Sequence, residues 1–578
     1  MLRRAGLVAV LIAIAAATGL ADDGDPPSRV ARLDYRSGSV SFRPGSVEEW
    51  TDATLNFPLT TGDHLWTDPG SQAEMHIGST GIRLAPQTAM SFLNLDDRTI
   101  QLSVTQGSLN IRLRNLADDE TVEVDTPNVS ITLLRPGDYR IDADGDNDVS
   151  TVTVRSGDVA VTGGGAAFPV HARETARIRG VDTVAQEIFG ALPQDGFDRW
   201  CQDREMRLDR SESARYVGAE MTGYEDLDDH GVWREDPQYG WIWIPRVEIG
   251  WAPYRFGHWA WVDPWGWTWV DDAPWGFAPF HYGRWAMVAG GWVWVPGTRV
   301  ARPVYAPALV AFVGGPGFGV ALGVGGGGGV AAWFPLGPHE VYRPAYHVSE
   351  VYVRQVNITH VTNINVVNVR YVNQAVPGAV TAVSQDTFVS ARPVGRGAIV
   401  VNARAMSQAQ VVGATAQVAP RRESVLAGTV RVGGAPARYT EHTVVAKTPP
   451  PPPPVSFRAR QRALEANQGK PLEPAEIDRI RGNAPVPHPM VRTVTPQAGG
   501  GKPNPAVQRN VEQPAPRTPV FERTAPPVQR NVEQPQVERP PQRPAVVERP
   551  AQEERREAVK KDEKKNPKKK EEEKKQDR

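Results

Sequence analysis

The residues of this chain whose type and spacing most clearly suggest a chemical role are its tryptophans. Of the 17 in the chain, thirteen lie between Trp233 and Trp294, and they are periodic. One element recurs every 26 residues, as Gly231-Val-Trp233, Gly257-His-Trp259 and Gly283-Arg-Trp285. A second recurs at 26 and 25 residues, as Gly240-Trp-Ile-Trp243, Gly266-Trp-Thr-Trp269 and Gly291-Trp-Val-Trp294. This pattern predicts three copies of one supersecondary unit.

Indole rings at such spacing could bind a sugar, because their faces stack on the apolar faces of pyranose rings while polar neighbours bond the hydroxyls. The candidate ligand-stacking residues are Trp241, Trp243, Trp251, Trp259, Trp261, Trp267, Trp269, Trp275, Trp285, Trp292 and Trp294. The alternative is that the rings form the core of a domain poor in aliphatic residues. Two interpretations therefore stay open, namely core alone and core plus a ligand face.

Metal chemistry has one weak candidate, a calcium loop formed by Asp142, Asp144, Asp146 and Asp148. An EF-hand needs Gly at position 6 and Glu at position 12, whereas this segment has Gly at position 4 and Thr153 at position 12. Asp-Gly between two strand patterns is typical of a hairpin turn. The repeat-junction histidines, His230, His258 and His281, lack the spacing of metal ligands. We therefore favour an acidic turn and predict no metal site.

Catalytic motifs are missing from the sequence. It contains no nucleophile elbow, zinc helix or dinucleotide fingerprint, and the glycine-rich segment 314–329 lacks the Gly-Lys-Ser/Thr ending of a phosphate loop. Cys201 is the single cysteine, so neither an intramolecular disulfide nor a Cys-based zinc site can form. It is best interpreted as a small buried hydrophobic residue. We predict no catalytic residues, no cofactor and no enzyme activity.

The elements that position the tryptophans are predicted to be β-hairpins. Trp at positions i and i+2 places both rings on one face of a strand. Turns follow at Asp236-Pro237, Asp263-Pro264 and Gly290-Gly291. Three hairpins would form a meander of about six strands over residues 229–311, which we name the tryptophan block.

The preceding segment, residues 28–185, is also predicted to be β. Alternation is clean in Ile100–Val104 and Leu109–Leu113, and turn signals such as Gln106-Gly107 and Ser156-Gly157-Asp158 separate the runs. Many short strands at 8–12-residue spacing indicate a sandwich or a roll. The ordered part of the chain is therefore expected to be mainly β.

This segment resembles the periplasmic domain of FecR-like proteins. The matching pieces are Thr61–Thr67, Ala73-Glu74, Ile82–Ala85, Gln106–Leu109, Val124–Pro127, Arg135–Tyr139 and Val154–Val159. The resemblance implies a β domain that, in that family, relays the occupancy of an outer-membrane receptor to a sigma factor. That relay needs a transmembrane helix and a cytoplasmic segment, neither of which we expect here.

The tryptophan block resembles the tryptophan-rich repeat region that follows FecR-like domains in exported bacterial proteins. The matching residues are Gly223–Leu227, the three repeat units and Phe334–Glu340. The resemblance implies an architecture rather than an activity.

The remaining segments are predicted from composition and periodicity. Residues 190–228 form a helical joint with one amphipathic helix, in which Phe197, Trp200, Cys201 and Leu208 fall near helical spacing. Residues 312–330 form a Gly-rich linker, and 331–448 a second, partly ordered β-rich segment with alternation over 353–372. Residues 449–578 are Pro-rich and charged, which predicts a disordered tail.

The N-terminus predicts export. Arg3 and Arg4 precede an apolar run of about 16 residues, short of the roughly 20 that span a bilayer, and small residues end it. We predict a signal peptide, residues 1–21, cleaved after Ala21, which leaves no transmembrane span in the mature chain. The expected location is periplasmic or extracellular. A formal net charge of -1 gives no indication of nucleic-acid binding.

These observations predict a non-catalytic exported cell-envelope protein that acts as a binding or scaffolding module. Its expected partners are cell-wall glycan or envelope proteins. The alternative is a FecR-type periplasmic sensor or regulator of envelope or iron-uptake signalling.

Overall fold

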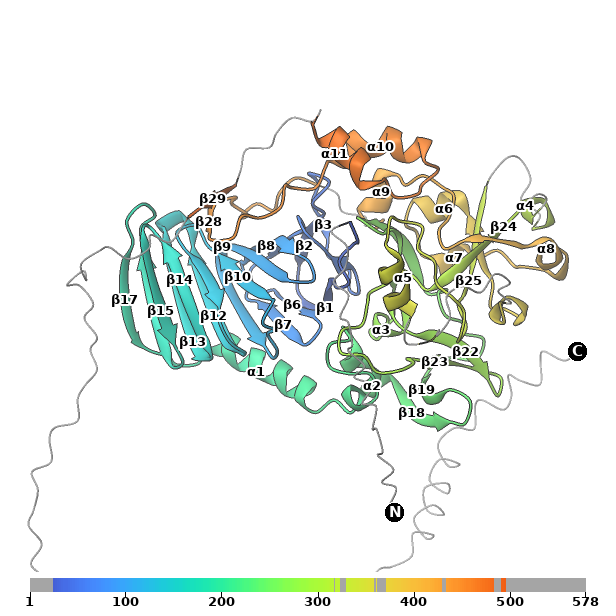
Figure 1. Cartoon of the computed structure of the whole chain (residues 1–578), viewed down its shortest axis with the longest axis horizontal. Helices are drawn as coiled ribbons and strands as arrows, with labels where there is room; N and C mark the ends of the chain where they lie inside the picture. Colours follow the sequence, from blue (N-terminus) through green and yellow to red (C-terminus); the bar gives the residue numbers. More distant parts are fainter. Residues whose placement is uncertain are drawn as a thin grey trace, which may run out of the picture. The chain divides into compact units, whose positions relative to one another are not determined.

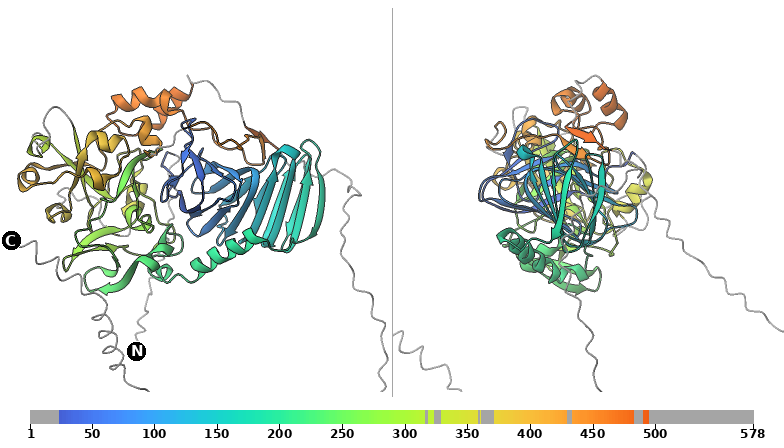
Figure 2. Two further views of the ribbon diagram at one scale, coloured as in Figure 1. Left: turned by 180° about the vertical axis from the view of Figure 1, so that it is seen from behind. Right: turned by 90° about the vertical axis from the view of Figure 1, so that its left-hand side faces the viewer.

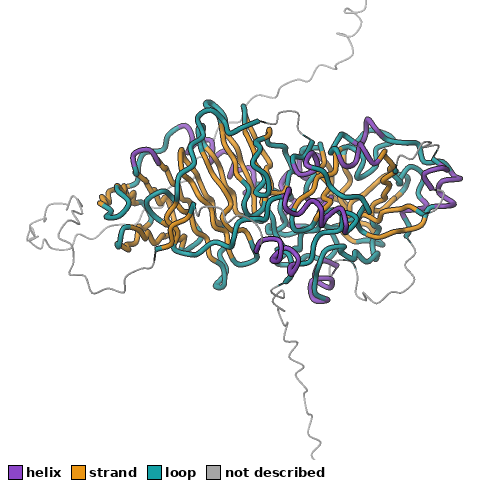
Figure 3. The backbone as a smooth tube through the Cα atoms, turned by 90° about the horizontal axis from the view of Figure 1, so that it is seen from above, coloured by secondary structure: helices purple, strands orange, loops and turns teal. Residues whose placement is uncertain are grey.

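The computed structural model describes residues 24–315, 318–322, 329–357, 360, 371–428, 433–482 and 490–494. All of them belong to one compact unit, Met1–Val511. The predicted signal peptide and most of the predicted tail lie outside the described residues. Strands outnumber helices through this part of the chain, so the prediction of a mainly β protein is confirmed (Figure 3).

The first seventeen strands pair into one extended sheet, which we name the N-terminal sheet (Figure 1). Its strands are β1 (Ala31–Ser37), β2 (Val40–Arg43), β3 (Thr51–Asp52), β4 (Pro58–Leu59), β5 (His64–Thr67), β6 (Gln72–Ile77), β7 (Thr80–Leu84), β8 (Ala89–Leu95), β9 (Thr99–Leu113), β10 (Thr121–Asp125), β11 (Ser130–Leu133), β12 (Gly137–Asp144), β13 (Val149–Ser156), β14 (Asp158–Gly163), β15 (Ala166–His171), β16 (Glu174–Arg179) and β17 (Ala185–Gly190).

Strand β9 connects much of this sheet. It pairs antiparallel with β7, β8 and β12 and parallel with β10. The two alternating runs that we expected as separate strands both lie in β9, so the turn predicted at Gln106-Gly107 is wrong. Gly107 has a φ of 87° and bends the strand without ending it. A Cβ there would lie 2.5 Å from the Gln87 carbonyl oxygen, which explains the glycine.

The tryptophan block contains three antiparallel hairpins, each joining the two predicted aromatic segments of one unit. Their strands are β18 (Gly231–Asp236) with β19 (Gly240–Pro245), β20 (Gly257–Val262) with β21 (Gly266–Asp271), and β22 (Arg284–Val288) with β23 (Gly291–Val295).

The predicted six-stranded meander is wrong. The first and third hairpins pair through Trp243 and Trp294 into a sheet of order β18-β19-β23-β22, and β20–β21 stays separate. The second hairpin instead packs its rings against later segments. Trp259 lies 5.2 Å from both Phe312 and Trp333, measured between ring centroids. The rings of β20–β21 thus pack against β24 and β25, and this hairpin does not pair with the strands of the other two hairpins.

A further sheet has the order β26-β25-β24-β27. Its strands are β24 (Val310–Gly314), β25 (Val330–Pro335), β26 (Thr381–Ser384) and β27 (Gln410–Gly413); β28 (Val444–Ala446) and β29 (Val491–Thr493) pair separately. The α-helices are α1 (Gly196–Asp209), α2 (Leu227–His230), α3 (Ala278–His281), α4 (Phe318–Ala321), α5 (Glu350–Asn357), α6 (Gln385–Val389), α7 (Val394–Gly397), α8 (Ala403–Gln408), α9 (Arg422–Val425), α10 (Phe457–Ala466) and α11 (Pro474–Gly482). The 3-10 turns are η1 (Gly145–Asn147), η2 (Ser213–Arg215), η3 (Tyr224–Asp226) and η4 (Asn373–Ala375).

Helix α1 is the amphipathic helix predicted in the joint. Asp195 and Asp198 form a capping box at its start, which satisfies two backbone N–H groups. Phe197, Cys201 and Leu208 are buried, and the helix contacts β9 of the N-terminal sheet (Figure 2). Across the described residues, no helix has the length and apolar composition that crossing a bilayer requires.

Two predictions for the second half of the chain are wrong. The alternating segment from Val353 begins as helix α5, and most of the rest lies outside the described residues. Residues 449–482 and 490–494 are ordered rather than disordered. In α10, Phe457 and Leu464 are buried, and the Arg460 guanidinium forms two bonds with Asp263, 2.7 and 2.6 Å long. Apolar side chains thus anchor a segment whose average composition is polar.

The hydrophobic core is continuous. One cluster of buried side chains includes residues of the N-terminal sheet, the tryptophan block and α10. The segments that we predicted as separate domains therefore share one core.

Candidate functional site

Most of the candidate ligand-stacking tryptophans are core residues. Nine of the eleven are at most 7% exposed, namely Trp243, Trp259, Trp261, Trp267, Trp269, Trp275, Trp285, Trp292 and Trp294. Three pairs of these rings contact each other edge to face, with centroids 5.0 Å apart for Trp243 and Trp275 and 5.6 Å apart for both Trp259 with Trp269 and Trp261 with Trp267. An exposed strip made of these nine rings is therefore excluded, because each already packs against other side chains.

Several buried indoles donate their N–H group to a nearby carbonyl oxygen, whereas the Trp259 N–H has no hydrogen-bond partner among the described residues. The Nε1 atoms of Trp243, Trp285 and Trp294 donate to the carbonyl oxygens of residues 227, 279 and 282, at 2.9–3.0 Å. A buried N–H without a partner costs free energy, so these bonds fix each ring in one orientation. The interpretation of the repeats as a core is thus correct for most of the block.

Two of the eleven candidates are accessible. Trp251 is half-buried, and Trp241 is 45% exposed. Trp241 belongs to a group of three rings that we name the aromatic shelf, formed by Tyr216, Trp233 and Trp241. Tyr216 stacks on Trp233 with a centroid distance of 4.5 Å and an angle of 22°, and lies 4.7 Å from Trp241. Trp233 and Tyr216 are both half-buried.

The register of the first hairpin positions this shelf. Trp233 pairs with Trp243 and Glu235 pairs with Trp241, so the indoles of residues 233 and 241 share one face of β18–β19. Tyr216 follows η2, which packs beside η3. Sequence reasoning omitted Trp233 and Tyr216 from the candidates. The tyrosine lies outside the repeat, so periodicity carried no signal for it.

Polar groups border the shelf. The Trp233 Nε1 atom donates to the Ser213 hydroxyl at 2.9 Å, and that hydroxyl donates to Asp228. The Asp228 carboxylate also accepts from the backbone N–H groups of residues 212 and 213, at 3.1 and 3.0 Å. Ser213 is 0% exposed, so these bonds hold Trp233 from its buried side, and Asp228, which is half-buried, is the member of this set that reaches the surface.

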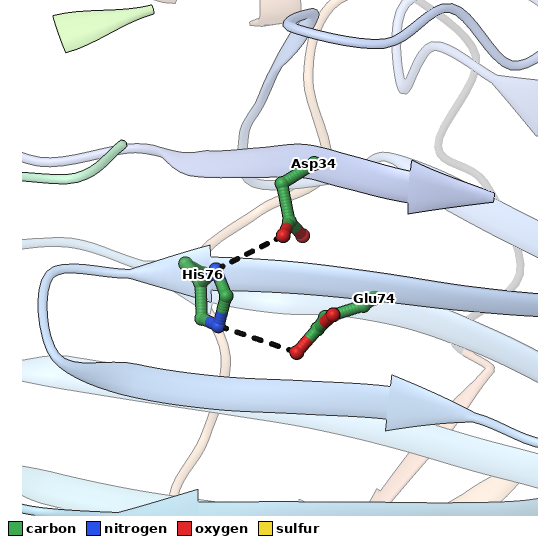
Figure 4. Close-up of side chains that lie close together, drawn as sticks. All are labelled: Asp34, Glu74 and His76. Carbon is green, nitrogen blue, oxygen red and sulfur yellow. Dashed lines mark ion pairs between the residues drawn. The ribbon is translucent and has the colours of Figure 1, made fainter. Parts of the chain in front are cut away.

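A second cluster was not predicted. Asp34 on β1 and Glu74 and His76 on β6 lie deep in the N-terminal sheet (Figure 4). The His76 Nδ1 atom is 3.4 Å from Asp34 and 3.3 Å from Glu225, and its Nε2 atom is 3.5 Å from Glu74. The His76 side chain is 1% exposed. One oxygen or nitrogen from each of Asp34, Glu74 and His76 lies within 4.8 Å of the others, close enough to hold a metal ion.

Guanidinium groups nevertheless occupy the carboxylates of this cluster. Arg83 lies 2.7 Å from Glu74 and 2.8 Å from Glu205, and Arg204 also contacts Glu74. Arg32 pairs with Asp226 at 2.5 Å. We name the whole group the charge cluster; it contains Arg32, Asp34, Glu74, His76, Arg83, Arg204, Glu205, Arg207, Glu225 and Asp226.

Protonated His76 balances the charges of this cluster. Three carboxylates, those of Asp34, Glu74 and Glu225, lie within 3.5 Å of the His76 ring nitrogens, which favours the imidazolium. Burial alone would lower the pKa of His76, but the charge of Asp34 and the close Asp34 and Glu225 carboxylates raise it well above the usual 6.5. Burial opposes ionisation of Asp34, yet His76 lowers the pKa of Asp34 to about 2. The arrangement therefore acts as a buried ion-pair network rather than a metal centre.

The charge cluster joins two segments that matched different families in the sequence, the FecR-like domain and the tryptophan-rich repeat region. Glu74 lies in the Ala73-Glu74 piece of the N-terminal segment, and Glu225 and Asp226 lie in Gly223–Leu227 before the tryptophan block. These two matches were the signal in the sequence that could have drawn attention to Glu74, Glu225 and Asp226. The contact between them was not predictable, because about 150 residues separate Glu74 from Glu225.

The aspartates of the weak calcium candidate point to different partners. Asp142 accepts from Ser108 at 2.5 Å and from Arg140 at 2.9 Å, while Asp144 accepts from the Asn147 backbone at 3.3 Å. Asp146 lies 3.4 Å from His442, and Asp148 has the left-handed φ of 51°. Asp142 and Asp144 lie at the end of β12, and Asp146 lies in the turn η1 that leads to β13, in agreement with the acidic-turn interpretation.

Cys201 is buried. Burial raises the pKa of its thiol, which disfavours the nucleophilic thiolate.

Comparison with known proteins adds a family match. Residues 224–340 match the model of a family of unknown function, DUF6600. The match includes the tryptophan block and β25 and leaves out the N-terminal sheet. Nothing among curated proteins matches the chain.

Two crystal structures of a proposed anti-sigma factor from Parabacteroides distasonis ATCC 8503 are similar to part of the chain. They are 13% and 12% identical to it, each with a TM-score of 0.20. Each comparison covers 22% of this chain and 60% of that chain, so this chain spans less than two thirds of those structures.

Proposed function

We propose that the protein is a non-catalytic, exported cell-envelope protein that binds cell-wall glycan through the aromatic shelf. The observation that carries this proposal is the 45% exposure of Trp241, next to Tyr216 and Trp233, in a block whose other indoles are almost all buried. Exposing an indole leaves apolar area in water, which a stacked sugar ring would cover.

The shelf is held in place by its surroundings. Trp233 lies 6.1 Å from the buried Trp294 and is bonded to Ser213, so its plane is fixed from two sides. Residues 224–226, close to η2 in the chain and in space, connect to the N-terminal sheet through Arg32 and His76. A rigid aromatic surface loses little conformational entropy on binding, which favours affinity for a weakly polar sugar face.

The test is sedimentation of the purified full chain with insoluble peptidoglycan, repeated for Trp241→Ala. We expect wild-type binding to saturate and the variant to bind at least tenfold more weakly, as loss of a central aromatic contact typically costs more than about 1.4 kcal/mol. Val232→Ala is the matched control, because Val232 is 49% exposed on the opposite face of the same hairpin. Equal binding by Trp241→Ala and wild type, or no wild-type binding, would refute the proposal.

A further inference from the structure

A C-terminal segment lies across the N-terminal sheet, and we name it the strap, residues 433–448. Its first contact is a two-way backbone pair with Trp50. The Trp50 N–H donates to the Gly433 carbonyl at 3.0 Å, and the Gly433 N–H donates back at 3.1 Å. Its last contact with a sheet backbone is the Val445 N–H, which donates to the Thr126 carbonyl at 2.9 Å. The strap is thus joined to the backbone beside β3 and β10 by two isolated antiparallel bridges.

Between these points the strap inserts one aromatic side chain. The Tyr439 ring lies 4.7 Å from Trp50 and 6.1 Å from Trp66, edge to face with both. Trp50, Trp66 and Ala89 form a small hydrophobic cluster of their own, and Tyr439 packs against it. The neighbouring Arg43 lies over the Trp50 ring and 3.3 Å from Glu441 of the strap. A pocket for one aromatic side chain therefore lies on this face.

The end of the strap is bound by buried polar side chains. Glu123, which is 0% exposed, accepts from the backbone N–H groups of Lys447 and Thr448 at 2.9 and 3.0 Å, and from the Thr448 hydroxyl at 2.7 Å. Gln101 donates to the Thr448 carbonyl at 2.8 Å. Three of these four bonds involve the main chain of the strap, and the fourth involves the Thr448 side chain.

Because Glu123 is buried, its carboxylate needs N–H donors from whatever segment lies on this end of the face. Glu123 sits two residues from Asp125 on β10, and both are buried. Burial and the charge of Glu123 raise the pKa of Asp125 well above its usual value. A buried carboxylate without hydrogen bonds is costly, so departure of the strap requires a replacement that brings N–H donors.

We propose that this face, formed by Trp50, Trp66, Gln101, Glu123 and Thr126, is a binding site for an extended segment of a partner protein that carries an aromatic residue. The strap occupies the site in cis. From Gly433 to Thr443 the strap forms neither a helix nor a regular strand, and it is held by the Gly433 bridge, the Tyr439 ring and the Glu441 and His442 side chains. This part is held less firmly than Val444–Ala446, which are at most 2% exposed and pair with β29, so it is the part most open to exchange. This site is separate from the aromatic shelf, and the proposal does not depend on glycan binding.

The test measures binding of the chain's own strap sequence in trans. A fluorescein-labelled peptide of residues 433–448 is titrated with the full chain and followed by anisotropy. A tethered segment competes at an effective concentration of the order of millimolar, so wild type should bind the peptide weakly. The full-chain variant Tyr439→Ala loses the aromatic insertion of its own strap, and we expect it to bind the labelled peptide at least tenfold more tightly.

Matched controls separate this mechanism from general loosening. Arg438→Ala changes the exposed neighbour of Tyr439 and should bind as weakly as wild type. A labelled peptide with alanine at the tyrosine position should bind Tyr439→Ala at least tenfold more weakly than the native peptide. Adding Glu123→Gln to the Tyr439→Ala chain should weaken binding as well. The proposal is overturned if Tyr439→Ala binds the peptide no better than wild type, or binds both peptides equally.

Discussion

Removal of Arg32 tests whether the charge cluster stabilises the shared core. The Arg32 side chain is 1% exposed and pairs with Asp226 at 2.5 Å and Glu225 at 3.4 Å. It also donates to the Asn56 side chain at 3.0 Å and the Pro274 carbonyl at 2.8 Å. The change Arg32→Met keeps much of the apolar stem and removes the charge, leaving two buried carboxylates and two other acceptors without this donor.

The expected cost follows from these contacts. Breaking a buried ion pair by removing one partner typically costs about 3–5 kcal/mol. Asp226 keeps Arg207 at 2.9 Å and Glu225 keeps His76, so neither carboxylate is left wholly uncompensated. We therefore expect a loss near the lower end, about 3 kcal/mol in the free energy of unfolding.

Urea unfolding of the full chain measures this loss. Tryptophan fluorescence and far-UV circular dichroism should give coincident transitions, which justifies a two-state treatment. Arg302→Met is the matched control, because Arg302 is 53% exposed and lies 3.5 Å from Asp119; such pairs contribute about 0–1 kcal/mol. If Arg32→Met costs no more than this control, the charge cluster does not stabilise the junction and the reasoning is wrong.

Three further predictions concern other buried groups. Because the pKa of His76 is raised, its stabilisation is fully present below pH 6.5 and is lost as pH rises through the raised pKa; thermal midpoints of His76→Gln should therefore fall less steeply with alkaline pH than those of wild type, and parallel curves would contradict this. The Cys201 thiol should resist a chromogenic disulfide until denaturant is added; reaction at the same rate in the native protein would show that it is accessible. Gly231→Ala should cost about 1–3 kcal/mol in a urea titration, because its Cβ would meet the Trp243 indole at 2.2 Å, whereas Gly291→Ala, with its nearest atom at 3.9 Å, should be near neutral; equal effects would refute the packing argument.

Local patterns in the sequence were sufficient to predict the hairpins. Alternation of indoles in Gly240–Trp243 and the turn signals between paired segments depend on neighbours in the chain, and the structure pairs Trp233 with Trp243 accordingly. The arrangement of the hairpins was not predictable in the same way. It depends on a single pairing of Trp243 with Trp294 and on contacts of Trp259 with Phe312 and Trp333, which are distant in sequence.

The same distinction explains the charge cluster and the ordered part of the tail. His76 gives no local sign that Asp34 and Glu225 surround it, since adjacent residues in a sheet can come from any part of the chain. In the tail, average composition predicted disorder, but a few residues decide the outcome. Phe457 and Leu464 enter the core, and Arg460 binds Asp263. Composition describes the mean of a segment and does not detect such anchors.

The shape and polarity of tryptophan explain why one residue type serves as core and as candidate site. A chain with one cysteine has no internal disulfide to fix its loops. The indole N–H groups of Trp285 and Trp294 donate to the carbonyls of residues 279 and 282. Each ring therefore fills the core and also fixes the backbone of a segment outside the strands. Phenylalanine would keep much of the apolar area but not the N–H bond. Trp241 differs from these two, because its ring packs on Tyr216 and is 45% exposed, which is why the proposed site is placed there.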